Sequence, residues 1–351
     1  MERFKMSGEY YILLTGAIKN VGDFLIADRS KKLFSYFVSN NFYEFNRWEN
    51  FEDKLDVINN AKAVIMCGGP GYASNMYPDI YPLVNDLSKL KVPIIPLGVG
   101  WSGQPRNNPL GFRFSSLSRK LMDYIHNFGL YSCRDILTEE ILKKEGYNQV
   151  VMTGCPVWYD LDSIGKPFKT KKDIRKIVFT TPASPKLLFE TIRVMKFLRD
   201  FFPESEIIVT FHRGIKRDKH TSFKTSLIYT LMAEYGKFLG FEIKDVSYDL
   251  SKIEFYNNMD LHIGYRVHAH LYFLSKRLPS ILICEDGRGI GMSKTLKLPV
   301  FLSRSNNLLS SLERYLRECI ETNFENQTFI SQFIDEKFFI MKEFLSKISL
   351  A

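Results

Sequence analysis

The sequence predicts an α/β protein in which helices cover both faces of parallel sheets. Short apolar runs alternate with longer segments that carry apolar residues at a spacing of three and four, almost from end to end. The short runs are apolar throughout, as in Ile207–Phe211 and Ser280–Cys284, which is typical of strands covered on both faces. This alternation indicates repeated strand-helix-strand units and therefore parallel sheets.

Each expected element follows from one of these two patterns: a short apolar run predicts a strand, and apolar residues spaced by three and four predict a helix. The expected strands are Tyr10–Thr15, Ala63–Cys67, Val92–Val99, Gly129–Cys133, Val150–Thr153, Lys176–Thr181, Ile207–Phe211, Leu261–Ile263 and Ser280–Cys284. The expected helices are Gly22–Val38, Tyr81–Leu90, Ser115–His126, Thr138–Glu145, Pro185–Phe202 and Ser222–Leu239, and another begins at about Arg266.

The chain is expected to form two domains and a tail. A polar, basic stretch at Gly165–Lys172 precedes a new strand-helix series and marks a boundary near residue 165. We therefore expect an N-terminal Rossmann-like domain at 1–165, a C-terminal one at 166–328 and an amphipathic helix at 329–351. The apolar stripe of this helix either packs on the protein or lies on a membrane surface.

Composition excludes several classes of protein. The 351 residues are 45% hydrophobic and 25% charged, which excludes a disordered chain and a small disulfide-stapled scaffold. The five cysteines have no paired spacing, so reduced thiols and a cytoplasmic location are expected. No apolar run approaches the roughly 18 residues that a membrane span needs.

The formal net charge of +9 is concentrated in two segments, 165–176 and 212–220. A basic surplus can serve nucleic acid, an anionic membrane surface or a small anionic substrate. The aromatic residues follow core-like periods and no nucleic-acid motif is present, so no nucleic-acid partner is expected.

The first expected strand runs into a glycine-containing loop, residues 16–23, that precedes a helix. Ligands of open α/β sheets bind beyond the carboxyl ends of the strands, so Asn20, Gly22 and Asp23 are candidate binding residues. Asp23 has an alternative role, because an acidic residue in the first turn also favours the helix dipole.

Glycines also follow the next two strands, at Gly68-Gly69 and at Gly98 and Gly100. Strand ends without side chains predict a wall where a ligand approaches the backbone, and Gly69 is the candidate contact. Arg134 and Asp135 follow another strand; Arg134 is a candidate ligand residue, whereas Asp135 has the alternative role of a helix cap.

The stretch Leu261–His270 is the most informative of the second half. Arg266 and His268 are expected in the first turn of a helix, where the dipole disfavours cations unless an anion is bound. His268 and His270 would point about 200° apart on a helix, so a shared metal is not expected.

Two further segments supply candidate anion ligands. Cys284–Lys294 is expected to be a glycine-spaced loop, which either holds phosphate through Arg288, Ser293 and Lys294 or is a mobile basic turn. His212 and Arg213 follow the strand Ile207–Phe211 and are expected at the same edge. Motifs of P-loop, zinc-protease, serine-hydrolase and zinc-cysteine sites are absent from the sequence, and Asp160-Leu161-Asp162 is only a weak metal motif, so no metal is expected.

In order, these motifs resemble those of the polysaccharide pyruvyl transferase family. The resemblance is carried by the following residues: Gly16, Asn20, Gly22 and Asp23; Gly68-Gly69; Gly98 and Gly100; Ser132, Arg134 and Asp135; Thr153-Gly154-Cys155-Pro156; His212; and Arg266, His268 and Ala269. It implies two Rossmann-like domains that face each other across a cleft, as in the GT-B fold.

The resemblance also implies an activity: transfer of a pyruvyl group from phosphoenolpyruvate to a sugar as a cyclic ketal. The acceptor would be a cell-surface polysaccharide or its lipid-linked precursor, with a peripheral contact at the inner face of the cell membrane as one alternative. Arg266 and His268 match the family's R-x-H pair. His268 is interpreted as the acid and base, Arg266 as the anion clamp and Asp23 as the residue that orients or deprotonates the sugar hydroxyl. No cofactor is implied.

A GT-B glycosyltransferase that uses a nucleotide sugar is the alternative, because the same basic second half would hold a diphosphate.

Overall fold

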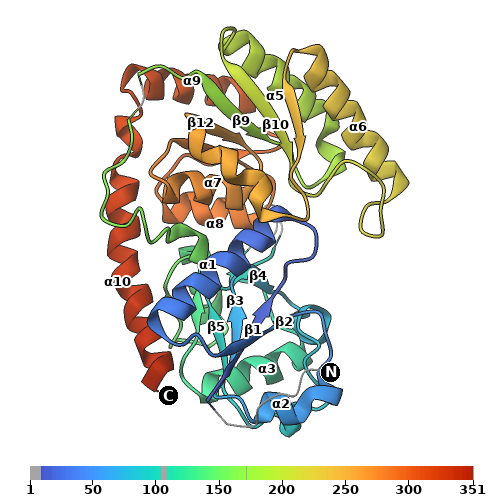
Figure 1. Ribbon diagram of the computed structural model, residues 1–351, viewed down its shortest axis with the longest axis vertical. Helices are drawn as coiled ribbons and strands as arrows, with labels where there is room; N and C mark the ends of the chain where they lie inside the picture. The colour runs from blue at the N-terminus through green and yellow to red at the C-terminus, as the bar shows by residue number, and fades with distance from the viewer. Residues whose placement is uncertain (1–8, 104–108, 171, 351) are drawn as a thin grey trace. The chain divides into compact units, whose positions relative to one another are not determined.

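The computed structural model describes residues 9–103, 109–170 and 172–350, so Lys171 of the basic linker and Ala351 of the expected tail helix lie outside the described residues. The chain forms two compact units (Figure 1). Unit 1 comprises residues up to Ala17, Ile26–Tyr159 and residues from Glu336 onward; unit 2 comprises Ile18–Leu25 and Asp160–Asp335. The divisions fall at Ala17/Ile18, at Tyr159/Asp160, and within helices α1 (Val21–Phe37) and α10 (Phe329–Leu350).

Unit 1 contains a four-stranded parallel sheet in the order β2-β1-β3-β5. Its strands are β1 (Tyr11–Thr15), β2 (Phe42–Asn46), β3 (Val64–Cys67) and β5 (Ile94–Leu97). Unit 1 also contains two pairs of short parallel strands: β4 (Pro70–Tyr72) with β6 (Gly100–Trp101), and β7 (Ser132–Cys133) with β8 (Val151–Met152). The other α-helices are α2 (Leu55–Asn59), α3 (Ser116–Asn127) and α4 (Ile136–Lys144).

Unit 2 contains a six-stranded parallel sheet in the order β11-β10-β9-β12-β13-β14 (Figure 1). The strands are β9 (Lys176–Thr180), β10 (Glu206–Phe211), β11 (Glu242–Asp245), β12 (Leu261–Gly264), β13 (Ser280–Cys284) and β14 (Phe301–Leu302). Numbered from β9, this is the 3-2-1-4-5-6 order of the Rossmann fold. The order reverses between β9 and β12, and ligands of this fold bind beyond the carboxyl ends at that switch point.

The helices of unit 2 connect these strands. They are α5 (Leu188–Phe201), α6 (Phe223–Phe238), α7 (Val267–Ser275), α8 (Gly287–Thr295) and α9 (Leu308–Glu321), and the longest 3₁₀ segment is Leu250–Asn258. Every residue of α7 is buried, because this helix connects two central strands. Every expected strand overlaps a strand of the structure, and the prediction of an α/β fold with parallel sheets is confirmed.

The prediction of a helix at Tyr81–Leu90 is wrong. The segment has only a 3₁₀ turn at Leu87–Lys89, and Leu83 has a left-handed φ of 45°. Its backbone is bonded to another segment, since the Phe51 N–H donates to the Leu83 carbonyl and Asn85 N–H donates to the Glu52 carboxylate. Pro82 also disfavours helical geometry at Tyr81. The apolar spacing here reflects burial of an irregular segment rather than a helical face.

The expected loop Cys284–Lys294 is also wrong, because most of it is helix α8. Asp286 caps this helix by accepting a hydrogen bond from the Arg288 N–H at 3.0 Å. Gly289 is needed for close packing, since a Cβ there would lie 3.0 Å from the Cys284 Sγ. Gly289, one of the glycines that predicted a loop, therefore serves helix-strand contact.

Residues 18–25 were expected in the N-terminal domain, but the structure groups them with unit 2. The Val21 N–H donates to the His212 carbonyl at 3.1 Å, and the Tyr248 N–H donates to the Lys19 carbonyl at 2.8 Å. The Lys19 ammonium pairs with Asp218 at 2.5 Å. These long-range bonds have no signal in the local sequence.

One close approach holds the switch point together. Gly264 ends β12 with φ 151°, and a Cβ there would lie 2.4 Å from Thr180 Oγ1 and 2.5 Å from the Thr180 carbonyl oxygen. The Thr180 carbonyl accepts the Tyr265 N–H at 3.0 Å and its hydroxyl accepts the Arg266 N–H at 3.1 Å. Only glycine lets β12 approach β9 closely enough for both bonds.

We expect Gly264→Ala to lower the free energy of unfolding by about 3 kcal/mol or more, because the clash is with backbone that cannot move aside. Gly240→Ala is the matched control: its φ is also positive, at 77°, but its Cβ would meet open space. The control should cost about 1 kcal/mol. Urea unfolding of both variants measures the difference, and equal losses would contradict the role of the contact.

Candidate active site

The sheet of unit 2 gathers a polar cavity at the carboxyl ends of β10, β12 and β13. The space among its lining atoms is about 370 Å³, including the part that is open to solvent. Its lining residues are Asn20, Gly22, His212, Tyr265, Arg266, Val267, His268, Glu285, Asp286 and Arg288. All of them belong to unit 2. The cavity therefore lies at the edge and near the switch point where this fold binds ligands.

Arg266 is the N-cap residue of α7 and is only 8% exposed. One guanidinium nitrogen, Nη2, donates to the Pro182 carbonyl at 3.4 Å, while Nε has no hydrogen-bond partner among the described residues. Burial lowers the pKa of this guanidinium, and the Glu285 carboxylate opposes the shift. A buried cation with an unpaired donor in a polar cavity is a site for an anion.

Glu285 directly follows β13, and a backbone N–H holds its carboxylate in place. Its carboxylate accepts hydrogen bonds from the Ala183 N–H at 2.9 and 3.1 Å. Burial raises its pKa, and the charges of Arg266 and Arg288 oppose this. Because Pro182 and Ala183 are consecutive, Glu285 and Arg266 are bonded to the same short segment after β9.

Arg288 lies in the first turn of α8. Its Nε donates to the Asp286 carboxylate at 2.8 Å. Burial lowers the pKa of Arg288, but the charges of Asp286, Glu285 and Asp23 outweigh it and keep this pKa above its ordinary value. The predicted residue Asp23 is not among the lining residues but directly follows Gly22, which is.

His212 follows β10 and is buried. Its Nε2 lies 2.9 Å from the Tyr256 hydroxyl, and its Nδ1 has no hydrogen-bond partner among the described residues. Burial holds the pKa of His212 well below its ordinary value, and the positive charge of Arg266 adds to the effect. His212 is therefore a neutral imidazole at physiological pH.

His268 lies in the first turn of α7, and only 5% of its surface is exposed. The loop after β1 packs against its ring. A Cβ at Gly22 would lie 3.0 Å from His268 Nδ1. The absence of a side chain at Gly22 thus allows the Asn20–Gly22 segment to close over the imidazole. Gly22 has this steric role whatever its part in ligand binding.

The structure brings together six of the predicted site residues in this cavity and places others elsewhere. The six are Asn20, Gly22, His212, Arg266, His268 and Arg288. Arg213 is exposed, and its charge acts on Arg266. Ser293, which is buried 3.6 Å from the Cys284 Sγ, and the exposed Lys294 lie farther along α8 and are not among the lining residues.

Gly69 and Arg134 belong to unit 1. Arg134 is fully buried, donates to the Asp135 carboxylate at 3.0 Å and to the Trp101 carbonyl at 3.0 Å, and fills the space beside Gly100. These contacts are structural, and Asp135 also caps α4 by accepting the Thr138 N–H. Binding roles for Gly69 and Arg134 stay predictions.

Sequence reasoning missed several residues of both units. Glu285 and Asp286 line the cavity directly after a predicted strand, and that position was the signal available for them. Tyr256, the partner of His212, comes from a 3₁₀ segment without a sequence signal. In unit 1, the missed Arg47 follows β2, is 6% exposed, and stacks on Trp48 with 4.4 Å from Cζ to the ring centre.

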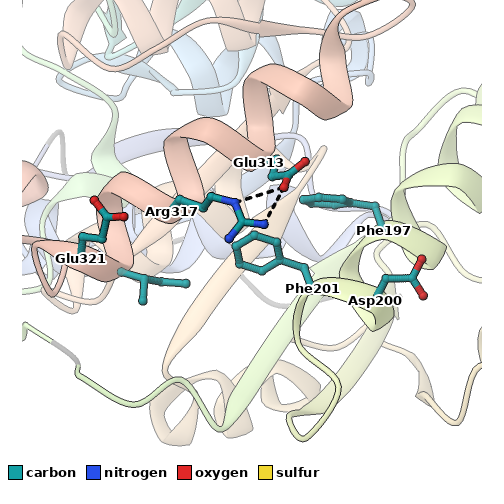
Figure 2. Close-up of a pocket in the computed structure, with 7 residues that line it drawn as sticks. Phe197, Asp200, Phe201, Glu313, Arg317 and Glu321 are labelled. Atoms are coloured by element: carbon teal, nitrogen blue, oxygen red, sulfur yellow. Dashed lines mark hydrogen bonds and ion pairs between the residues drawn. The ribbon is translucent and has the colours of Figure 1, made fainter.

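A larger hollow of about 980 Å³, again with the part open to solvent included, lies between α5 and α9 (Figure 2). Its guanidinium, Arg317, pairs with Glu313 at 2.7 Å and lies 5.2 Å from the centre of the Phe201 ring. The guanidinium of this hollow is thus paired on an exposed surface, whereas the smaller cavity holds the buried Arg266, whose Nε has no hydrogen-bond partner among the described residues. We therefore assign the candidate site to the smaller one.

In the part of the chain that the structure describes, neither a metal centre nor a membrane-spanning helix is found. Across residues 9–103, 109–170 and 172–350, no group of three or more His, Cys, Asp or Glu side chains is placed to hold a metal ion. In the same part of the chain, every helix is too short or too polar to cross a membrane.

Solved structures with the same arrangement of elements define the class of fold. S. aureus MnaA, in a co-structure with UDP, is 10% identical, with 95% of this chain and 97% of that chain covered and a TM-score of 0.56. A putative UDP-N-acetylglucosamine 2-epimerase from Listeria monocytogenes is 10% identical, with 92% and 94% covered and a TM-score of 0.54. UDP-GlcNAc 2-epimerase from Neisseria meningitidis, bound to UDP-GlcNAc, is 9% identical, with 95% and 100% covered and a TM-score of 0.52. The fold is thus GT-B-like, with two Rossmann-like domains.

The family follows from the sequence. The model of the polysaccharide pyruvyl transferase family matches residues 20–284, which is more than half of the chain. The chain belongs to this family and is a transferase. A search among curated proteins finds no match.

The buried histidines predict a loss of stability in acid. Burial holds the pKa of His212 and His262 well below the ordinary 6.5 and lowers that of His270 to about 3. Below pH 6.5 the unfolded chain binds protons that the native imidazoles do not. The free energy of unfolding should therefore fall by about 1.4 kcal/mol per pH unit for each of them.

Unfolding free energies measured between pH 6.5 and 4 test this. His270→Asn keeps a group that can bond the Ser280 hydroxyl, which the His270 Nδ1 contacts at 2.7 Å. Its slope should be smaller by about 1.4 kcal/mol per pH unit. A slope equal to that of the unaltered protein would contradict the buried, neutral state of His270.

Proposed function

We propose that this transferase moves the pyruvyl group of phosphoenolpyruvate onto two hydroxyls of a sugar as a cyclic ketal. The observation that carries the proposal is the buried Arg266, whose Nε has no hydrogen-bond partner among the described residues and which lines the cavity with His268 and Arg288. Phosphoenolpyruvate carries a carboxylate and a phosphate, and guanidinium groups bind both in a bidentate manner.

The reaction assigns a place to each proton. One acceptor hydroxyl adds to C2 of the enol while C3 gains a proton and becomes the methyl group. The C2–O bond to phosphate then breaks, the second hydroxyl adds to C2, and the proton of that hydroxyl leaves with inorganic phosphate. The two hydroxyl protons are thus balanced by one C–H bond and one phosphate proton, and the net reaction needs no oxidant or reductant.

The residues of the cavity divide these tasks. His268 protonates C3 and accepts the hydroxyl proton, a cycle that suits an imidazole near neutral pH. Arg266 clamps the carboxylate or phosphate, and Arg288 contributes positive charge around the leaving phosphate. Asp23, whose charge acts on Arg288, orients or deprotonates the acceptor hydroxyl. Neutral His212 offers its Nδ1 as a further polar contact.

The acceptor is proposed to be a sugar of a cell-surface polysaccharide or of its lipid-linked precursor. Such a precursor would bring the protein to the inner face of the cell membrane from the cytoplasm. Phosphoenolpyruvate is a substrate, so the proposal includes no cofactor, no metal and no nucleic-acid partner.

Substitutions at the cavity test the donor site. With phosphoenolpyruvate and a pyruvylatable acceptor, Arg266→Ala and His268→Ala should each release phosphate at least about 100-fold more slowly, because one removes a charge-assisted contact and the other the proton carrier. Arg193→Ala, on the exposed face of α5, is the control and should retain full turnover. Near-normal turnover in either cavity variant would refute the assignment.

Ligand binding separates the two candidate donors. UDP is bound in the similar S. aureus structure, and the alternative of a nucleotide-sugar donor follows from that likeness. We expect phosphoenolpyruvate to raise the melting temperature in a thermal-shift titration and Arg266→Lys to weaken this effect, since lysine cannot form the bidentate contact. Stabilisation by a UDP-sugar alone would favour the alternative.

A further inference from the structure

Helix α6 of unit 2 carries four large apolar side chains in a stripe on its outer face. Phe223 is 66% exposed, Leu227 51%, Leu231 49% and Phe238 82%. At 100° per residue these four side chains fall within an arc of about 80°. A stripe of large apolar side chains that all face solvent is not needed to pack the helix.

The opposite face of α6 already packs the helix onto its unit. Tyr229, Met232, Ala233 and Gly236 are buried there, and α6 lies beside α5 and β11 (Figure 1). Single exposed apolar residues are common on protein surfaces, whereas an apolar stripe four turns long indicates an interaction surface. Glu234 falls within the same arc as the four apolar side chains, and its charge is paired with Lys237 at 2.7 Å.

The segment that leads into α6 is cationic. Exposed cations at Arg213, Lys216, Arg217, Lys219 and Lys224 precede or begin the helix. The acid among them, Asp218, is paired with Lys19. A helix with one exposed apolar face and lysines and arginines at its end has the features of a helix that lies in a lipid interface.

This surface and the cavity meet the same edge of the sheet. His212 lines the cavity at the carboxyl end of β10, and Arg213 is the next residue of the cationic segment. The first residue of α6, Phe223, follows that segment. The amino-terminal end of the stripe is therefore on the cavity side of unit 2.

We propose that the outer face of α6 and the cationic segment 213–224 bind an anionic lipid bilayer surface. The apolar side chains would enter the acyl boundary while the cations contact anionic headgroups. The cationic segment favours an anionic surface over a second copy of this chain, which presents the same cations and, among the described residues of this face, no matching acidic patch. The inference deepens the proposed function, since a lipid-linked acceptor would be held where the cavity opens.

Vesicle flotation tests this surface with the full chain and without donor or acceptor. Binding is expected to vesicles of phosphatidylcholine mixed with phosphatidylglycerol, and much less to phosphatidylcholine alone. Phe223→Ser should reduce binding about tenfold because a large apolar contact is lost. Phe339→Ser on α10, whose phenylalanine is also 66% exposed, is the matched control and should bind normally.

Charge and alternative partners are tested in the same format. Arg217→Ala should weaken binding about fivefold, whereas Arg314→Ala, exposed on α9, should not, and high salt should weaken binding of the unaltered protein. Equal binding of Phe223→Ser and Phe339→Ser, or a dimer in light scattering that only Phe223→Ser dissociates, would overturn the proposal.

Two variants distinguish the proposed lipid-binding surface from the proposed donor site. Arg266→Lys should still float with anionic vesicles while it loses phosphate release. Phe223→Ser should still release phosphate with a soluble sugar acceptor. Loss of both properties in one variant, with circular dichroism that reports folding intact, would contradict the separation of the two sites.

Discussion

The hydroxyl of Thr180 joins the strand and the helix on which the cavity depends. It accepts the Arg266 N–H at 3.1 Å and lies 2.9 Å from the His262 Nε2. His262 in turn contacts the Ser280 hydroxyl at 2.7 Å, so one buried chain of polar groups crosses β9, β12 and β13. Buried polar groups of this kind are stable only when their partners are in place. The start of α7, and with it Arg266, is positioned by this chain.

In the cavity, burial and neighbouring charges shift the pKa values of Arg266 and Glu285 in opposite directions. Burial lowers the pKa of Arg266 and raises that of Glu285, and each charge favours the charged state of the other. Arg288 and Asp286 form an ion pair at the same edge. The excess donors of Arg266 remain available, which is the state that an anionic substrate would complete. Rossmann topology explains the location, because the loops of adjacent strands separate at the switch point.

Two kinds of surface meet at one edge of unit 2. The cavity is polar and buried, whereas the α6 stripe is apolar and exposed, and the cationic segment after His212 connects them. The cationic segment holds five Lys and Arg residues against Asp218, a net +4 of the chain's +9, whereas Glu285 and Asp286 balance the two arginines of the cavity. A donor anion would contact the buried arginine of the cavity, and an anionic membrane would contact the exposed cations of the segment.

The sequence by itself determined the parallel α/β fold, because strands covered on both faces must be apolar throughout. It also located Arg266 and His268, since cations at the start of a helix are a local anomaly that the helix dipole makes visible. It could not show β2 or β11, which are half-exposed edge strands, or the helix that replaces the loop at Gly287–Thr295. Only the tertiary structure grouped Asn20–Asp23 with His212 and added Glu285 and Tyr256, because those contacts join residues far apart in the chain and depend on sheet order rather than on local spacing.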